Sequence, residues 1–141
     1  MAWTFYNASG EALVQHAESE ATQAELEAET AIAHFVPPDL VKNSPGVAKG
    51  WCRITAAGAI ESPDYNVDSV TDTGTGNRTI VWDTDFSTNV YVVLTTSAAA
   101  SNIGDVRTSA HAVGSVVVEV LNSGFTGLQD TNHSNAAFGD Q

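Results

Sequence analysis

The sequence predicts a mainly β protein: an antiparallel β-sandwich or jelly-roll-like domain preceded by one N-terminal α-helix that forms a short stalk. Two observations predict it. From about residue 47 onward, apolar and polar residues alternate in short stretches separated by turn residues, which is typical of half-buried strands. Before that point, an Ala- and Glu-rich stretch has apolar residues at helical spacing. We divide the chain into an N-terminal arm (1–10), an acidic helix (11–35), a Pro/Gly linker (36–47) and an all-β domain (48–141).

The arm is expected to be extended, because Trp3 and Phe5 alternate with Thr4 and Tyr6. Turn-forming residues follow, and Ser9 is suited to cap the helix that begins after them. The helix itself contains no Gly or Pro over residues 11–34. Its apolar positions are spaced 3, 4, 3, 4, 3 and 4 residues apart, which is a heptad seam. This predicted oligomer seam or anchor consists of Val14, Ala17, Ala21, Ala24, Ala28, Ala31 and Phe35.

A seam made mostly of alanine buries little area and, at roughly 25 cal/mol per Å², gives little stabilisation. The helix also carries glutamates that have no cation within four residues to offset them. We therefore expect the helix to need a partner, and three arrangements stay open. Three copies could form a thin stalk around an axis, the helix could pack on another protein, or it could lie on the β domain of its own chain.

The linker holds three of the four prolines of the chain, which end the helix. Seven strands at hairpin spacing are then predicted, and they indicate an antiparallel sandwich or barrel. Residues 73–77, Thr-Gly-Thr-Gly-Asn, suit a tight hairpin with positive φ values. The predicted strands are 48–55, 65–72, 78–83, 90–97, 105–112, 115–121 and 135–139.

Charge and the length of the apolar stretches argue against two classes of partner. The chain has 17 acidic and 5 basic residues, a net charge of −12, and its first 41 residues contain no Lys or Arg. Binding to a phosphate backbone requires clustered Lys and Arg, so no nucleic-acid partner is expected. No stretch approaches the roughly 20 apolar residues that span a bilayer, so no membrane partner is expected.

Part of the chain resembles a known family. Residues 47–141 are similar to a β domain that recurs in tail-fibre and other virion proteins of bacteriophages. The resemblance depends on the order and spacing of four short pieces, and Gly50, Cys52 and Arg53 depart from the more usual residues. The pieces are Ala48-Lys49-Gly50-Trp51, residues 65–72, Gly74-Thr75-Gly76-Asn77 with the strand after it, and Ala136-Ala137-Phe138-Gly139-Asp140.

The resemblance implies a structural protein located in the virion, with no enzymatic activity, no cofactor and often a trimeric state. We expect a homotrimeric short tail fibre or spike whose outer β domain attaches to a glycan or protein of the host surface. The arm and helix would dock onto other phage virion proteins of the tail or capsid. The alternative is a capsid decoration or head fibre protein with the same architecture. A depolymerase-type enzyme is the least favoured hypothesis, because no catalytic motif is present.

Residues that could carry chemistry have simpler interpretations. Cys52 is expected to be a buried thiol, and no catalytic or metal-binding residue is predicted. His16 and His34 are expected on one exposed helix face, and His111 and His133 on the surface or in loops.

The aromatic residues divide into two groups. We expect Trp51, Trp82 and Tyr91 in the core. Phe125 lies between Gly124 and Gly127 and is the candidate receptor-contact residue, since loops on a rigid scaffold often carry binding sites.

Overall fold

The computed structural model describes residues 5–6, 9, 12–13, 20–30, 34–98 and 103–141. The chain divides into two compact units, Met1–Ser44 and Pro45–Gln141. The boundary between them falls inside the predicted linker.

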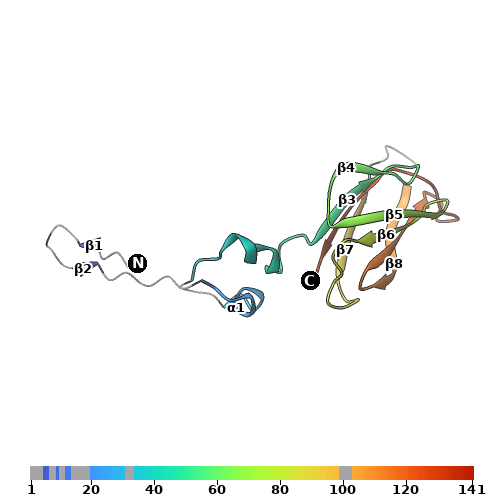
Figure 1. The fold of residues 1–141 in the computed structure, drawn as a ribbon. Helices are drawn as coiled ribbons and strands as arrows, with labels where there is room; N and C mark the ends of the chain where they lie inside the picture. Colours follow the sequence, from blue (N-terminus) through green and yellow to red (C-terminus); the bar gives the residue numbers. More distant parts are fainter. Residues whose placement is uncertain (1–4, 7–8, 10–11, 14–19, 31–33, 99–102) are drawn as a thin grey trace. The chain divides into compact units, whose positions relative to one another are not determined.

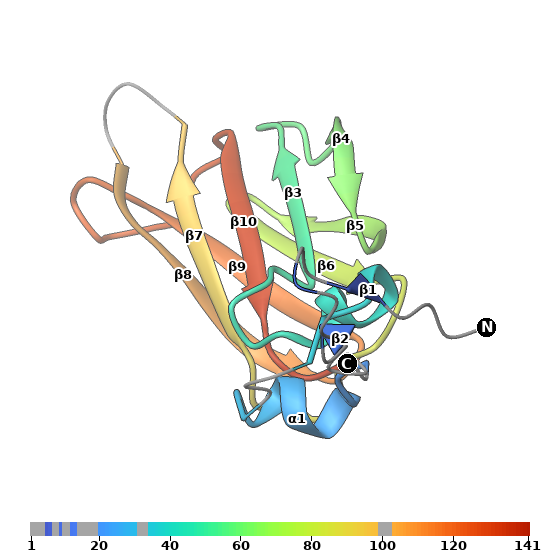
Figure 2. The same cartoon turned by 90° about the vertical axis from the view of Figure 1, so that its left-hand side faces the viewer.

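The second unit is an antiparallel β-sandwich, which confirms the predicted fold class (Figure 1). One four-stranded sheet has the order β4-β3-β10-β7 and the other has the order β5-β6-β9-β8, as Figure 2 shows with the first sheet in front. The strands are β3 (Gly50–Ile54), β4 (Ile60–Tyr65), β5 (Val67–Gly74), β6 (Asn77–Trp82), β7 (Val92–Ser97), β8 (Ile103–Ala112), β9 (Ser115–Asn122) and β10 (His133–Phe138).

Each of the seven predicted stretches overlaps one of the strands β3 and β5 to β10, but β4 was not predicted. The sequence Ser62-Pro63-Asp64 indicates a turn, yet these residues lie within β4. Proline has no N–H to give to a second neighbour, so it is tolerated on an edge strand. Strand β4 is such an edge, because it pairs with β3 alone among the described strands.

Alternation along the strands builds the core. In β9, Val116, Val118 and Val120 are buried while the residues between them are half-buried. The inner faces of both sheets meet in a cluster that also contains three aromatic rings. Phe86 and Tyr91 are stacked with ring centroids 4.0 Å apart, and the indole N–H of Trp82 donates to the Tyr91 hydroxyl over 3.1 Å. The core positions predicted for Trp82 and Tyr91 are confirmed.

Trp51 is a correction to the predicted core. It is 38% exposed, because the two residues that flank it in β3, Gly50 and Cys52, occupy the inward positions. The inward position 50 holds a glycine for a steric reason, because a Cβ there would lie 2.9 Å from the Trp82 ring.

The first unit differs from the predicted acidic helix. Strand β1 (Phe5–Tyr6) pairs with β2 (Ala12–Leu13), where the helix was expected to begin. Helix α1 covers only Gln23–Glu27, and a short 3-10 helix, η1, covers Pro38–Asn43. Residues 14–19 and 31–33 of the predicted helix lie outside the described residues.

The observed helix is short because local signals define its ends. Thr22 and Glu25 form a capping box: the Thr22 N–H donates to the Glu25 carboxylate over 2.9 Å, and the Glu25 N–H donates to Thr22 Oγ1 over 3.3 Å. Glu29 adopts a φ of 54°, which is incompatible with a continuing helix. Helices shorter than about 12 residues are marginal without packing, and no residue of α1 is buried. The continuous helix predicted over 11–35 is therefore wrong in extent.

Candidate functional site

Four connections between strands gather at one end of the sandwich, which we term the loop end. The register fixes this arrangement: His133 at the start of β10 lies opposite both Ile54, the last residue of β3, and Ser97, the last residue of β7. In the other sheet, the β5–β6 hairpin lies at the same end as the last residues of β9, since Asn77 pairs with Glu119. The connections are 55–59, 75–76, 98–102 and 123–132, with 99–102 outside the described residues.

The chain enters the sandwich at the opposite end. The N–H of Lys49 donates to the carbonyl of Ala137 over 2.7 Å, and Gly50 pairs with Ala137. The β8–β9 turn at Val113 and Gly114 lies at this entry end too, because the Trp82 N–H donates to the Gly114 carbonyl over 2.9 Å. The loop end is thus the part of the sandwich farthest from its point of entry.

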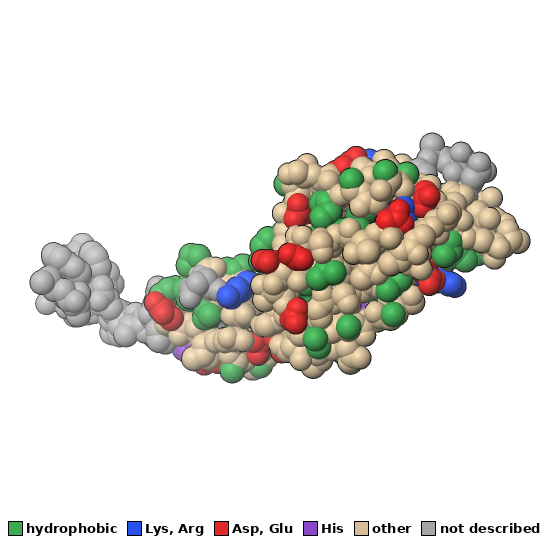
Figure 3. Space-filling model, turned by 45° about the vertical axis from the view of Figure 1, so that its right-hand side comes forward, with side chains coloured by type: hydrophobic (Ala, Val, Ile, Leu, Met, Phe, Trp, Pro, Cys, Tyr) green, Lys and Arg blue, Asp and Glu red, His purple; other side chains and the backbone are tan. Residues whose placement is uncertain are grey.

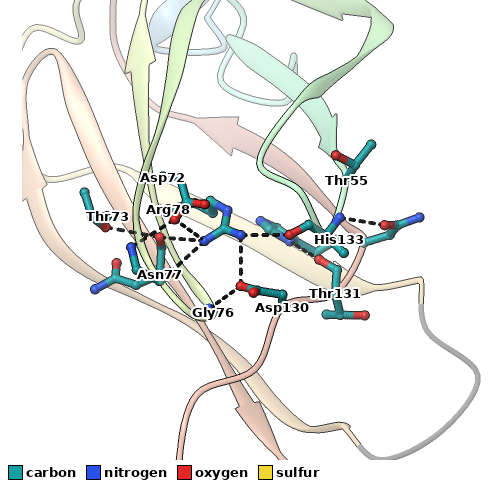
Figure 4. Close-up of polar contacts among 12 residues, drawn as sticks. Thr55, Asp72, Thr73, Gly76, Asn77, Arg78, Asp130, Thr131 and His133 are labelled. Carbon is teal, nitrogen blue, oxygen red and sulfur yellow. Dashed lines mark hydrogen bonds and ion pairs between the residues drawn. The ribbon is translucent and has the colours of Figure 1, made fainter.

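A buried arginine fastens the loop end (Figure 4). Arg78 is 2% exposed and begins the inward row of β6. Its Nη1 donates to Asp72 Oδ1 over 2.9 Å and to the Gly74 carbonyl over 2.7 Å. Its Nη2 donates to the Ala56 carbonyl over 2.8 Å and to Asp130 Oδ1 over 2.9 Å. One guanidinium therefore holds two of the four connections and the end of β5 that leads into a third, and we term these contacts the Arg78 clasp.

Asp130 closes the clasp from the β9–β10 connection. The backbone N–H of Gly76 donates to its carboxylate over 2.6 Å, and Arg78 is the second donor. Hydrogen bonds to the charged form favour that form. The Gly76 N–H first, and then Arg78, lower the pKa of Asp130 despite some desolvation.

His133 is a correction to the expected surface histidine. It is 1% exposed and its Nδ1 lies 3.1 Å from the Thr131 carbonyl. No described residue hydrogen-bonds its Nε2. Burial lowers its pKa, and the neighbouring Arg78 cation lowers it further, while the Thr131 carbonyl acts in the opposite direction. The surroundings of His133 therefore favour the neutral imidazole over the cation.

Asn132 joins the remaining connections. Its side-chain oxygen accepts from the Ala56 N–H over 2.8 Å, and its backbone carbonyl accepts from the Ala98 N–H over 2.8 Å. The first residue of the β7–β8 connection is thereby tied to the same end. Together with the Arg78 clasp, these bonds give each connection at the loop end at least one fixed point.

Phe125 projects from this end. Its side chain is 63% exposed and its φ is 54°. Asn122 holds the turn: its carbonyl accepts from the Phe125 N–H over 2.9 Å, and its side-chain oxygen accepts from the Thr126 N–H over 3.1 Å. A Cβ added to Gly104 of β8 would lie 3.3 Å from the edge of the Phe125 ring. The ring is thus an exposed apolar group on a fixed backbone.

The predicted seam is only partly described. Ala21 is 3% exposed and its N–H donates to the Phe35 carbonyl over 3.0 Å, while Phe35 itself is 44% exposed. Ala24 lies in α1 and Ala28 follows it, and both are exposed. Val14, Ala17 and Ala31 lie outside the described residues, as does His16. The described members do not form one continuous apolar stripe, because α1 ends before the seam does.

Chemistry-bearing residues of the described chain do not converge. No group of three or more His, Cys, Asp or Glu is close enough to hold a metal ion within the described ranges. Cys52 is buried, as predicted, and burial raises the pKa of its thiol to about 11. His34 is half-buried, with Nδ1 3.4 Å from a Glu25 carboxylate oxygen. None of the helices in the described residues has the length and apolar content to span a membrane.

Comparisons of the chain with family models, with curated proteins and with solved structures gave no match.

Neither the Arg78 clasp nor the burial of His133 was predicted from the sequence, although the sequence contains a signal for the inward position of Arg78. Ile80 and Trp82 are apolar and two residues apart, so period-two alternation places Arg78 on the same inward face. For His133, the predicted strand began two residues too late to show the alternation with Asn135 and Ala137.

Proposed function

We propose that this chain is a structural protein of a bacteriophage particle, the subunit of a short trimeric fibre or spike whose loop end contacts the host surface. The family resemblance over residues 47–141 supports the virion assignment. The geometry of the sandwich supports the direction of contact, because its fastened loops lie at the end opposite to chain entry. The observation that carries the proposal is the structure of the loop end, where the Arg78 clasp holds the connections and the exposed Phe125 projects from one of them.

A fastened loop end suits attachment for a physical reason. Loops that are already ordered lose less conformational entropy on binding than mobile loops do. An aromatic ring on a fixed turn offers a large apolar surface for stacking on a sugar or packing on a protein. Three copies on one particle would add avidity to a weak single contact.

The experiment measures binding of the purified chain to cells of the host that the phage infects, with Phe125→Ser as the test variant. Val113→Ser is the matched control, because Val113 is an apolar turn residue, 43% exposed, at the entry end. We expect Phe125→Ser to weaken binding about tenfold or more and Val113→Ser to leave it unchanged. Equal binding by all three proteins would contradict a role for the loop end, and the absence of any binding would contradict host attachment.

Decoration of the capsid is the second candidate, and the shortness of α1 favours it. A fibre needs an element that holds the sandwich away from the particle, and α1 has five residues, about 8 Å at 1.5 Å per residue. The same subunit could stand directly on a capsid surface. The number of copies per particle separates the two: hundreds of copies support decoration, and a small multiple of three supports a tail fibre.

A further inference from the structure

The outer face of the β4-β3-β10-β7 sheet carries apolar side chains in two adjacent rows. The register places Leu94 of β7 beside Ala136 of β10, Ala136 beside Trp51 of β3, and Trp51 beside Tyr65 of β4. In the next row, Val92 lies beside Phe138. Leu94, Val92 and Tyr65 are 60%, 58% and 48% exposed, respectively. We term these six residues the apolar face.

The charges beside the apolar face are balanced. Toward the loop end the same side of the sheet carries Thr96, Ser134, Arg53 and Glu61. Arg53 Nε lies 2.9 Å from Glu61 Oε2, so the cation and the anion compensate each other. On the side of the sandwich that Figure 3 shows, acidic side chains are spread over the surface with few basic ones among them. The apolar face is therefore nearly neutral on a chain of net charge −12.

Strand β7 borders the apolar face and differs from the other edge strands. Natural proteins protect sheet edges with charges, prolines or bulges. Strand β4 has two acids and a proline, and β5 and β8 each have charges and register shifts. Strand β7, Val92–Ser97, has no charge and no proline, and its register with β10 runs without a shift over all six residues. It pairs with β10 alone among the described strands. An edge of this kind is expected to be covered in the working assembly.

We propose that the apolar face and the β7 edge form the contact between sandwiches of sister copies in the oligomer. Every copy carries the same net charge of −12, so a contact between copies is favoured where the surface has no uncompensated charge. The apolar face meets this condition. The inference rests on the oligomeric state in the proposed function and is independent of which receptor the loop end contacts.

The area of the apolar face sets the expected strength of the contact between copies. Four strands about 4.8 Å apart and six residues rising about 3.3 Å each give about 400 Å² in projection for the whole outer side of the sheet, and the apolar face is about half of it. A standard interface buries about 800 Å² per partner. The contact is therefore weak on its own, and association is expected to depend on protein concentration.

Sedimentation equilibrium of the full chain over the micromolar range tests the contact, with Leu94→Glu as the test variant and Val113→Glu as the matched control. We expect the wild-type protein and Val113→Glu to self-associate equally. Leu94→Glu should weaken association by about tenfold or more, because each contact would then bury a charge. Added salt should strengthen wild-type association, because it screens the repulsion between acidic chains. A wild-type monomer throughout, or equal association of Leu94→Glu, would overturn the proposal.

A cysteine variant gives an independent readout. The single native cysteine, Cys52, is buried, so an engineered thiol at position 94 would be the accessible one. Mild oxidation should join pairs of Leu94→Cys chains into disulfide-linked dimers and leave Val113→Cys chains unlinked. Equal linking of the two variants would count against the contact. Host binding is measured separately through Phe125, so failure of the contact and failure of host attachment are distinguishable.

Discussion

The guanidinium of Arg78 donates to the carboxylate of Asp130 over 2.9 Å, and the two residues are 52 positions apart in the sequence. This bond connects the beginning of β6 to the long connection before β10. Because Arg78 also holds Ala56 and Gly74, its contacts determine whether the loop end keeps one shape.

Replacing Arg78 with Met should destabilise the sandwich. Three backbone carbonyls would lose their charged donor, and two carboxylates would lose their counter-ion, so we expect the free energy of unfolding to fall by about 3 kcal/mol. Urea denaturation measures it. Arg107→Met is the control, because Arg107 pairs with Glu119 while 56% exposed and should cost less than about 1 kcal/mol. Equal costs for the two variants would show that the clasp contributes nothing beyond a surface ion pair.

Gly76→Ala should destabilise the same end for a steric reason. Gly76 has a φ of +64°, and a Cβ there would lie 2.5 Å from the Gln129 N and 2.7 Å from the Gln129 carbonyl oxygen. The Gln129 backbone cannot move away without breaking the bond that its N–H donates to the Val120 carbonyl over 2.9 Å. We expect a loss of about 3 kcal/mol or more in thermal unfolding.

Gly74→Ala is the comparison for this steric effect. Gly74 also has a positive φ, but its Cβ would meet nothing within 4 Å. Gly74→Ala should therefore lower the free energy of unfolding less than Gly76→Ala does. A larger loss for Gly74→Ala would contradict the contact assigned to Gly76.

Stability should fall as the pH falls below 6.5, and His133 is the cause. Its pKa is lowered from 6.5 in the folded chain, so between 6.5 and that lower value the unfolded chain binds more protons than the folded chain. The free energy of unfolding therefore decreases through this window, by at most about 1.4 kcal/mol per pH unit. Urea midpoints measured from pH 7.5 downward give the slope. His133→Gln should flatten it, and an unchanged slope in that variant would exclude His133 as its source.

Phe125→Gly separates binding from folding. Glycine tolerates a φ of 54° better than phenylalanine does, and the lost ring is mostly exposed, so stability should change by no more than about 0.5 kcal/mol. Host binding should nevertheless weaken about tenfold or more, as expected for Phe125→Ser. A large loss of stability would show that the ring has a packing role instead.

Alternation and turn residues were sufficient to predict most of the sandwich. The valines of β9 and the Ile80–Trp82 pair of β6 mark their inner faces directly. Strand β4 could not be predicted this way, because its tolerance of Pro63 depends on a place at the sheet edge, which only the strand order reveals. The helix over 11–35 was overestimated because a heptad of alanines gives the spacing of a seam without enough buried area to sustain it.

The candidate site was harder to predict than the fold. Phe125 was identified because glycines flank it and mark a turn. The Arg78 clasp requires residues 56, 74, 78 and 130 to meet at one end, and that depends on pairings between distant strands. The apolar face is likewise distributed over four strands, and its continuity depends on register.

The most direct test of the proposed function is an image reconstruction of the phage particle that contains this chain. The proposal predicts density for the sandwich on the outside of the particle, in copies related by a three-fold axis, with the Phe125 turn outermost and the apolar faces toward the neighbouring copies. The proposal would be contradicted by particles without this density, or by sandwiches whose loop ends face the particle.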